Sequence, residues 1–340
     1  MQSSLRRFDS YPHLIDMSPQ EYIQSRLKGL KEPSGLGRAS GGHNEMVDEI
    51  FRLAMSKKFR KYSVSPEYAE HIRSAIQFNI EKDEPIKFTL VFGGYKLWRL
   101  KEAPEVDWAE LFSLIYYANW VKPIAEIYKP GIWFDFYSDD VILEFMNNVP
   151  KTDTEAYGKS FRALLEFFNV YLPPNIKFTL NRVRDQYPSY EAFKTNLDQE
   201  INKLKEELKN NIPELTTEQV KMIEQNVKLN PGQGEDLQWR EKVQLIHDGY
   251  TCVSGRRPYY RTPDKIMVIT RPIDNSIAVG TTKTSVVKFW IGVGALKKRG
   301  DSFIETVLSP EQIEAVSSEV EPIKISGLED ENFNNIRIVV

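Results

Sequence analysis

Residues 124–140 read IAEIYKPGIWFDFYSDD, and this stretch decides the class of fold. From 107 to 128, apolar residues recur every three or four positions, which predicts a long helix that Pro123 kinks or divides. The KPG triplet predicts a turn, and 132–137 predicts a strand. Because that strand shows no polar alternation, we expect it to be buried on both faces, as strands of a parallel sheet are.

The rest of the chain repeats this alternation of strand and helix. A strand at 85–94 precedes the long helix and forms a strand–helix–strand unit with 132–137. Further segments of the same character are the helix 154–172 and the strands 176–183, 265–272 and 276–280. Asp274-Asn275 is the expected hairpin turn between the last two strands. The sequence therefore predicts an α/β fold, a Rossmann-like and mostly parallel sheet flanked by helices.

The character of the sequence changes along the chain, which predicts its organisation. Residues 1–45 are expected to form an N-terminal arm. Residues 189–229 are charged, helical in pattern and poor in aromatic residues, which predicts a helical subdomain or lid. The α/β body then comprises 46–188 and 230–340.

Composition bounds the chemistry that the chain can perform. Its 340 residues carry a net charge of −3, which does not favour nucleic acid or an anionic membrane as a partner. The single cysteine, Cys252, excludes an internal disulfide and a cysteine-based zinc site, and the four histidines lack metal-ligand spacing. The sequence shows neither a signal-peptide pattern nor an apolar stretch long enough to span a membrane. We therefore expect a cytoplasmic protein, whose oligomeric state the sequence does not fix.

The first polar segment at a predicted strand end is GGYKLWR, at 93–99. Gly93 and Gly94 allow a ligand to approach the backbone closely, and Lys96 and Arg99 supply two cations. Two cations beside backbone N–H groups suit a phosphate or a carboxylate. A hairpin turn with solvated basic side chains is the alternative interpretation.

The second polar segment is Ser138-Asp139-Asp140, which ends the predicted strand 132–137. Asp139 is at the position of a helix cap, where a carboxylate also gains from the helix dipole. Asp135 lies inside the apolar strand, so it needs a cationic partner or an exposed strand end. Carboxylates that follow a strand also bind Mg²⁺ or Mn²⁺ in nucleotide-sugar transferases, which makes these three aspartates an alternative metal site.

The third polar segment is basic and aromatic and covers 254–271. Five cations lie within 16 residues of one another: Arg256, Arg257, Arg261, Lys265 and Arg271. With tyrosines between them, such a cluster can bind nucleic acid through charge and stacking. Because the net charge of the chain is negative, a local anion pocket is the simpler interpretation.

Taken in order, these pieces resemble the isocyanide (isonitrile) synthase family, also known as the pyoverdine/dityrosine biosynthesis family. In that family a strand leads to a lysine-bearing loop, a helix that ends in Ile-Tyr-x-Pro-Gly, a strand that ends in Ser-Asp and a tyrosine-containing helix. The matching segments here are FTLVFGGYK (88–96), PEVDWAEL (104–111), IAEIYKPG (124–131), WFDFYSDD (133–140) and KTDTEAYGKSFRALL (151–165). Further on, 240–250 and 258–272 are similar to the family's last helix and its arginine-containing strand.

The resemblance implies a Rossmann-like fold and an enzyme of secondary-metabolite biosynthesis that needs no cofactor. In the implied reaction the amino group of an amino acid, often tyrosine or tryptophan, becomes an isonitrile, and ribulose 5-phosphate supplies the carbon. The implied partners are thus a small-molecule amine and a sugar phosphate. Lys96, Arg99 and Arg271 are candidates for holding the phosphate, and Asp139 for holding the ammonium of the amino acid.

The implied reaction also needs a general base, because the amine must lose a proton before it attacks the ketone. Glu110 and Asp140 are the candidates. The candidate catalytic residues are thus Lys96, Glu110, Asp139 and Asp140. The candidate substrate-binding residues are Gly93, Gly94, Arg99, Asp135, Ser138, Arg257, Arg261 and Arg271. We expect Lys96 and Asp139 to lie in one cleft.

The chain departs from the family pattern at three places. Lys96 is followed by Leu-Trp-Arg instead of Ser-Pro-Asn, the strand 265–272 ends Ile-Thr-Arg-Pro instead of Ser-Ile-His-Pro, and Asp140 stands where the family often has glycine. The fold is therefore expected to transfer more surely than the activity. Two alternatives stay open: a glycosyl or nucleotidyl transferase that uses the three aspartates with Mg²⁺ or Mn²⁺, and a non-catalytic polyanion-binding protein that uses 254–271.

Overall fold

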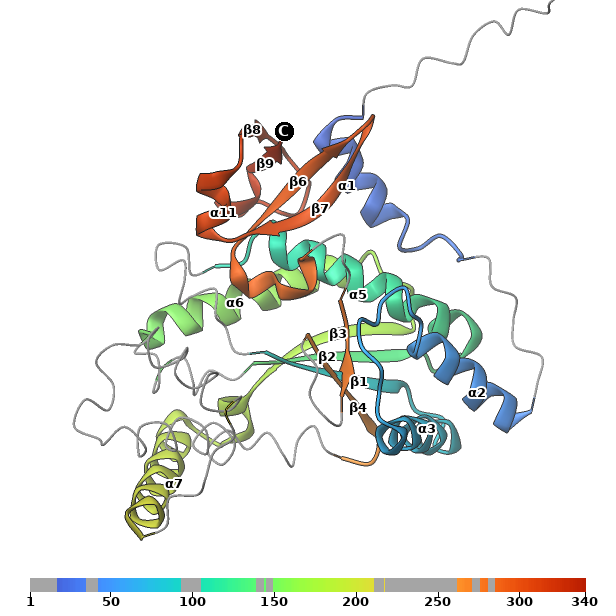
Figure 1. Ribbon diagram of the computed structural model, residues 1–340, viewed down its shortest axis with the longest axis vertical. Helices are drawn as coiled ribbons and strands as arrows, with labels where there is room; N and C mark the ends of the chain where they lie inside the picture. The colour runs from blue at the N-terminus through green and yellow to red at the C-terminus, as the bar shows by residue number, and fades with distance from the viewer. Residues whose placement is uncertain are drawn as a thin grey trace, which may run out of the picture.

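A computed structural model describes residues 17–34, 42–92, 105–138, 144, 149–210, 217, 262–270, 276–280 and 285–340. Within these ranges the chain forms two β-sheets, and the long helix α5 (Trp108–Ile127) lies between them (Figure 1). No helix in this part of the chain is long and apolar enough to cross a membrane.

The larger sheet consists of parallel strands. They are β1 (Ile86–Phe92), β2 (Ile132–Ser138), β3 (Ile176–Arg182), β4 (Lys265–Ile269) and β5 (Ile277–Ala278). The order across the sheet is β3-β2-β1-β4-β5, and every neighbouring pair is parallel. This order is that of doubly wound folds, in which the chain grows outward from a central strand on both sides. The predicted α/β fold with a parallel sheet is confirmed.

Two helices connect the first three strands across one face of the sheet. Helix α5 leads from β1 to β2, and α6 (Lys151–Asn169) leads from β2 to β3 (Figure 1). Helix α5 begins at a capping box formed by Asp107 and Glu110. It runs through Pro123 without a break, so the helix is not divided there. Burial of nearly the whole helix outweighs the hydrogen bond that proline removes.

Further helices precede β1 and follow β3. Helices α2 (His43–Ala54) and α3 (Pro66–Glu81) precede β1. Tyr68 of α3 accepts a hydrogen bond from the backbone N–H of Met267 at 2.7 Å, which ties the helix to β4. After β3 come the 3₁₀ turn η2 (Val183–Gln186) and helix α7 (Tyr190–Asn210). The boundaries predicted for the arm, the body and the helical subdomain remain predictions.

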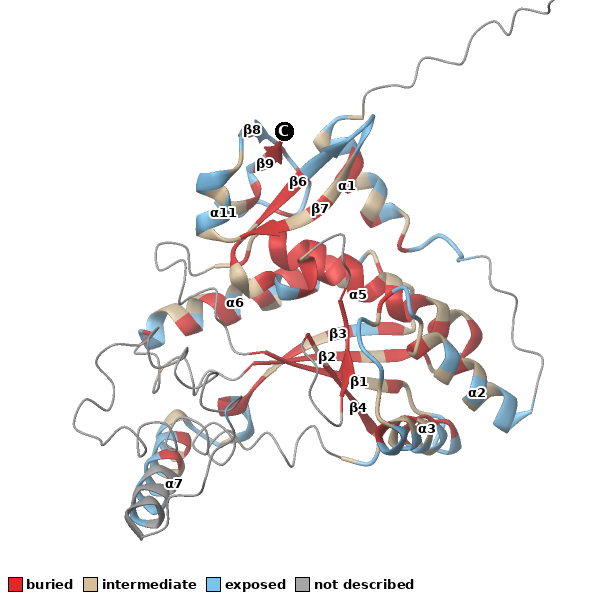
Figure 2. Ribbon diagram, viewed as in Figure 1, coloured by how far each residue is buried: buried red, intermediate tan, exposed pale blue. Residues whose placement is uncertain are grey.

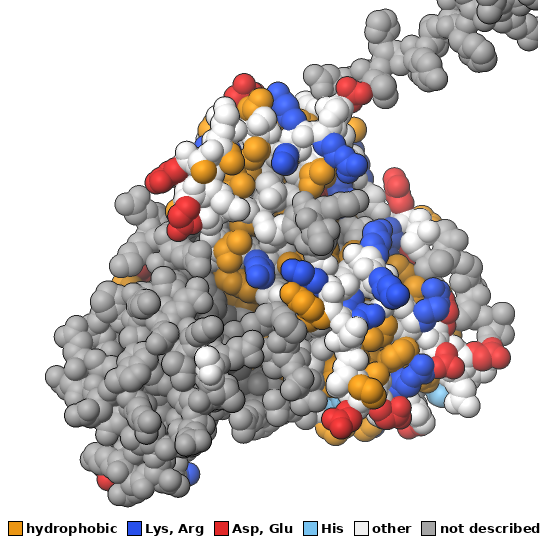
Figure 3. Space-filling model, in the orientation of Figure 1, with side chains coloured by type: hydrophobic (Ala, Val, Ile, Leu, Met, Phe, Trp, Pro, Cys, Tyr) orange, Lys and Arg blue, Asp and Glu red, His pale blue; other side chains and the backbone are white. Residues whose placement is uncertain are grey.

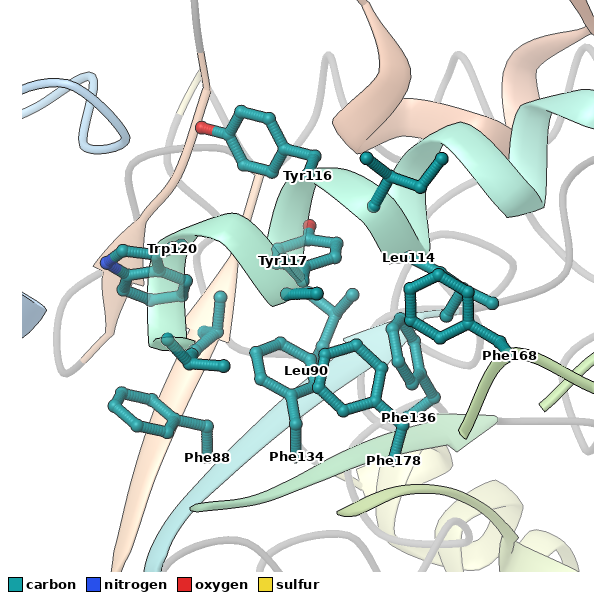
Figure 4. Close-up of a cluster of buried hydrophobic side chains, with 14 of the residues drawn as sticks. Phe88, Leu90, Leu114, Tyr116, Tyr117, Trp120, Phe134, Phe136, Phe168 and Phe178 are labelled. Atoms are coloured by element: carbon teal, nitrogen blue, oxygen red, sulfur yellow. The ribbon is translucent and has the colours of Figure 1, made fainter. Parts of the chain in front are cut away.

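An aromatic core fills the space between α5 and the larger sheet (Figure 4). Phe134 of β2 lies at its centre, with its ring 4.9 Å from that of Tyr117 and 5.1 Å from that of Phe178. Phe88 and Trp120 close the cluster, with ring centroids 5.3 Å apart. These side chains are all buried, as the red core of Figure 2 shows. Because apolar burial drives folding, this layer stabilises the packing of α5 on the sheet.

The smaller sheet is mixed and packs on the other side of α5. Its strands are β6 (Val293–Arg299), β7 (Ser302–Leu308), β8 (Ser318–Pro322) and β9 (Asn335–Val339), in the order β7-β6-β9-β8. Gly294 allows the close approach to α5, since a Cβ there would lie 2.3 Å from the backbone nitrogen of Ala109. Helix α1 (Pro19–Lys28) is held to β7 by Arg26, whose Nε lies 2.8 Å from Glu305 Oε1. The remaining short elements are η3 (Val286–Ile291), α11 (Pro310–Ala315) and η4 (Glu331–Phe333).

Strands β4 and β5 are parallel, so the hairpin predicted at Asp274-Asn275 is wrong. Val268 pairs with Ile277 in parallel register, and the next residues along each strand pair in the same way. Apart from Lys265, both strands are apolar, and they are almost wholly buried. Burial on both faces is typical of parallel strands, and here it outweighs a local turn signal.

Candidate functional site

The carboxyl ends of the parallel strands meet at one edge of the larger sheet. Phe92, Ser138 and Arg182 are the last residues of β1, β2 and β3, and they lie side by side in the register. The strand order reverses at β1: β2 and β3 lie on one side of it, and β4 and β5 lie on the other side. Ligands of open α/β sheets bind at the carboxyl edge near such a reversal of strand order. We therefore place the candidate site at this edge.

Two predicted polar segments follow strands that end at this edge, β1 and β2, whereas the third segment precedes and includes β4, and only its Arg271 follows that strand. Most of their functional residues lie outside the described part of the chain: Gly93, Gly94, Lys96, Arg99, Asp139, Asp140, Arg257, Arg261 and Arg271. The shared cleft for Lys96 and Asp139 therefore remains a prediction, as does the helix cap at Asp139. The structure describes three of the predicted site residues, which are Glu110, Asp135 and Ser138.

Glu110 is fully buried at the first turn of α5. Its Oε2 accepts a hydrogen bond from the backbone N–H of Asp107 at 2.9 Å, and its Oε1 accepts one from the hydroxyl of Tyr157 at 3.2 Å. The positive end of the helix dipole favours the ionised carboxylate at such a position. Glu110 is thus held in place by a capping box on one side and by a phenol from α6 on the other.

Arg182 and Ser138 lie next to each other at the ends of β3 and β2, and both are buried. The Nη1 of Arg182 donates to Glu155 Oε2 at 2.9 Å. Its guanidinium lies against Gly158 of α6, where a Cβ would come within 3.1 Å of Nη1. A buried arginine is tolerated only when its charge is paired. Here the carboxylate of Glu155 pairs with it, and the missing side chain of Gly158 leaves room for the guanidinium. Arg182 places a fixed cation at the carboxyl edge.

A second arginine connects the site to helix α7. Arg184 donates to Glu155 Oε1 at 2.6 Å and also to the buried carboxylate of Glu144. Glu144 in turn accepts a hydrogen bond from the hydroxyl of Tyr190 at 3.4 Å. The Nζ of Lys151 lies 3.4 Å from the centre of the Tyr190 ring. The first residue of α7 is therefore bound to a residue that follows β2.

Asp135 lies on the opposite face of the sheet from the aromatic core and is only 2% exposed. Its Oδ1 accepts hydrogen bonds from Thr179 Oγ1 at 2.7 Å and from Asn181 Nδ2 at 2.6 Å. The nearby charge is Lys265, whose pKa is lowered by burial, an effect that the negative charge of Asp135 opposes. Of the two possibilities that the sequence left open for Asp135, the structure shows a nearby cation, supplied by β4, and not an exposed strand end.

Lys265 was predicted to belong to a basic, anion-binding segment, but its side chain is only 9% exposed. It lies in the interior beside Trp133, 5.7 Å from the centre of the ring. On the face seen in Figure 3, lysine and arginine side chains of the described residues are mixed with hydrophobic and uncharged ones. In the described ranges, no group of three or more histidine, cysteine, aspartate or glutamate side chains could hold a metal ion.

Sequence reasoning missed several residues of the candidate site, above all Tyr157 and Arg182. The hydroxyl of Tyr157 donates a hydrogen bond to Glu110, which lies 47 positions away in the chain, so no local sequence pattern predicts the contact. Arg182 could have been found from the sequence, because it is a charged residue at the end of a predicted strand, and Ser138 is a polar residue at the corresponding position of the preceding strand. Thr179 and Asn181 could also have been found, because they alternate with apolar residues in β3.

Comparison with known proteins reveals a shared fold. No family model matches the chain, and no curated protein matches it. The crystal structure of PvcA from Pseudomonas aeruginosa matches with a TM-score of 0.56 and 15% sequence identity, over 86% of this chain and 99% of that one. At this identity the likeness demonstrates the fold alone. The Rossmann-like fold that the sequence resemblance implies is confirmed by it.

Proposed function

We propose that this protein is an isonitrile-synthase-like enzyme of secondary-metabolite biosynthesis. In the proposed reaction it condenses the amine of an amino acid, or a related amine, with a sugar phosphate such as ribulose 5-phosphate. The proposal includes a cytoplasmic location, where sugar phosphates are made. It is supported by the resemblance of the sequence motifs to the isonitrile synthase family and by the fold shared with PvcA.

One observation carries the proposal: the strands that lead into the family-like motifs end at a single edge of the sheet. The motif strands β1 and β2 are adjacent and parallel, with Phe92 opposite Ser138. The buried side chains of Glu110, Tyr157 and Arg182 are gathered near this edge from α5, α6 and β3, and Arg182 is paired with the exposed Glu155. A buried carboxylate and a fixed cation in one region suit proton transfer beside an anionic substrate.

Each residue has a proposed role in this reaction. We assign the sugar phosphate to Lys96, Arg99 and Arg271, and the ammonium of the amine to Asp139. Glu110 is the proposed general base, since a buried carboxylate that accepts hydrogen bonds from a backbone N–H and a phenol can accept a proton from the substrate. In the first step the free amine attacks the ketone carbon, and the carbonyl oxygen takes up a proton.

The test is a direct search for product by mass spectrometry. Purified protein is incubated with tyrosine or tryptophan and with ribulose 5-phosphate uniformly labelled with ¹³C. We expect an isonitrile that gains one labelled carbon, in a reaction lost in Lys96→Ala and reduced at least tenfold in Glu110→Gln. Lys177→Ala, a change at an exposed position of β3, is the matched control and should retain activity.

A parallel thermal-shift panel separates this proposal from the alternatives. A ligand at 100 times its dissociation constant stabilises the fold by about 2.7 kcal/mol, which a melting curve detects. Stabilisation by ribulose 5-phosphate without added metal supports the proposal. Stabilisation only by a nucleotide sugar with Mn²⁺, or only by a polyanion at low salt, would replace it with the corresponding alternative.

A further inference from the structure

The face of the larger sheet that points away from α5 carries a row of polar side chains. Phe88, Phe134 and Phe178 point toward α5 (Figure 4), so the residues one position further along each strand point the other way. Those residues are Thr89, Asp135 and Thr179, and the parallel register places them side by side across β1, β2 and β3. We call these three residues the polar row.

The hydrogen atoms of the polar row are oriented toward its centre. Trp133 Nε1 donates to Thr179 Oγ1 at 2.8 Å, which leaves the hydroxyl proton of Thr179 to point at Asp135. Asn181 Nδ2 donates to the same carboxylate oxygen. Asp135 is therefore a carboxylate fixed by neutral donors before any ligand arrives, as binding sites require.

Thr89 is the second observation, and it points to a ligand. Its side chain is only 1% exposed, and its Oγ1 has no hydrogen-bond partner among the residues that the structure describes. A buried hydroxyl without a partner costs stability, so such a group calls for an explanation. A ligand hydroxyl placed between Thr89 and Asp135 would provide the missing partner.

The chemistry of the row favours a neutral, hydroxylated ligand over an ammonium group. Lys265 already lies close enough to Asp135 for the two charges to interact, so a second cation beside the carboxylate would be repelled. Hydroxyl groups both donate and accept, which matches a carboxylate beside a threonine. Thr179 and Asn181 are partly exposed, so a ligand can reach this end of the row.

We propose that the polar row of Thr89, Asp135 and Thr179 binds the hydroxyl groups of a sugar phosphate. The row lies three residues before the strand ends, about 10 Å at roughly 3.3 Å per residue, so a phosphate at the carboxyl edge would leave the carbon chain along this face. The identity of the ligand as a sugar phosphate rests on the proposed function. The row itself is a subsite for a hydroxylated carbon chain.

The experiment measures sugar binding by titration calorimetry on the full chain. The probes are ribulose 5-phosphate, unphosphorylated ribulose and inorganic phosphate. We expect Thr89→Val to weaken ribulose 5-phosphate binding about threefold to tenfold, the effect of one neutral hydrogen bond. Asp135→Asn should weaken it more than tenfold, because it replaces a charged acceptor with a neutral amide. Binding of inorganic phosphate should be unchanged in both variants.

Thr89→Val is the sharper variant because it keeps the shape of the side chain and removes only a hydroxyl without a described partner. Its melting temperature should equal or exceed that of the wild type. Ser113→Ala is the matched control: Ser113 is equally buried, its Oγ also lacks a partner within the described residues, and it lies on α5 across the sheet. It should leave sugar binding unchanged.

Two outcomes overturn the inference. One is a folded Thr89→Val and a folded Asp135→Asn that bind ribulose 5-phosphate as the wild type does. The other is a wild type that binds neither ribulose 5-phosphate nor ribulose. Failure of the proposed function looks different: sugar binding that depends on Thr89 and Asp135, with no isonitrile formed. If both variants form isonitrile with an unchanged KM for the sugar phosphate, the inference about the polar row is wrong and the proposed function stands.

Discussion

The two faces of the larger sheet are built from the same strands, yet they have opposite chemistry. Toward α5 the strands present Phe88, Phe134 and Phe178, whose rings pack into one cluster. One residue further along, the other face presents Thr89 and Asp135 with the partly exposed Thr179. A parallel sheet covered on both sides is ordinarily apolar on both, so the polar face is the exception.

The difference suggests that the two faces of the same strands have different roles. The aromatic face supplies the burial that holds the sheet to α5. The polar face keeps a carboxylate in the interior with neutral donors and a lysine around it. Buried polar groups of this kind cost stability unless each is satisfied, so natural sequences retain them mostly where function needs them.

The largest effect is expected on the aromatic face. Phe134→Ala should reduce the free energy of unfolding by about 3–5 kcal/mol, because it removes a fully buried ring from the centre of the cluster. Urea denaturation followed by circular dichroism measures the change. Thr89→Val, one strand away on the other face, is the control and should cost nothing. Equal decreases in the free energy of unfolding for both variants would contradict the proposed difference between the two faces.

A smaller loss is expected on the polar face. Asp135→Leu should destabilise the protein by about 1–3 kcal/mol, since it leaves the donors of Thr179 and Asn181 without their acceptor and removes the charge near Lys265. Asp135→Asn keeps an acceptor oxygen and should cost less. The same denaturation assay compares them. A leucine variant more stable than the wild type would mean that the carboxylate is a net burden on the fold.

The next effect concerns the packing at the carboxyl end of the aromatic face. Gly158→Ala should destabilise by about 1 kcal/mol, although alanine ordinarily favours a helix over glycine. The reason is that the new Cβ would lie 3.1–3.3 Å from atoms of the Arg182 guanidinium. In an Arg182→Met background the same change should become neutral or stabilising. A stabilising effect in the wild type would show that Arg182 can move away freely.

The smallest effect is a dependence of stability on pH. Burial lowers the pKa of Lys265 below its ordinary value of 10.5, so the unfolded chain holds this proton to higher pH than the folded one does. Folding then releases a proton, and the free energy of unfolding should rise as pH increases toward 10.5. Lys265→Met should remove this part of the rise in a series of melting curves. Lys177→Met, at an exposed position of β3, should retain it.

Much of the fold was predictable because its signals are local. The capping box of α5, the apolar runs of β1 and β2 and the turn at Gly131, whose φ is +79°, all follow from neighbouring residues. The hairpin predicted between β4 and β5 failed for the same reason. A dipeptide reports only its own turn preference, whereas strand direction is set by how buried strands pair.

The surroundings of the described site candidates were predictable in part. The sequence placed Glu110 in the first turn of a helix, Asp135 inside an apolar strand and Ser138 at the end of that strand, and the structure finds all three buried beside polar neighbours. It could not pair Glu110 with Tyr157 or Asp135 with Lys265, because these partners come from distant segments. Contacts of this kind depend on the register between strands and on the placement of helices.

The sequence by itself determined the alternation of helices and strands, since periodicity and capping act over a few residues. It also determined that the acidic segment follows a buried strand. Only the tertiary structure decided which face of that strand Asp135 would occupy and what it would meet there. Asp135 faces Thr89 and Thr179 because three strands pair in one register, and a shift by a single residue would turn it toward the aromatic core.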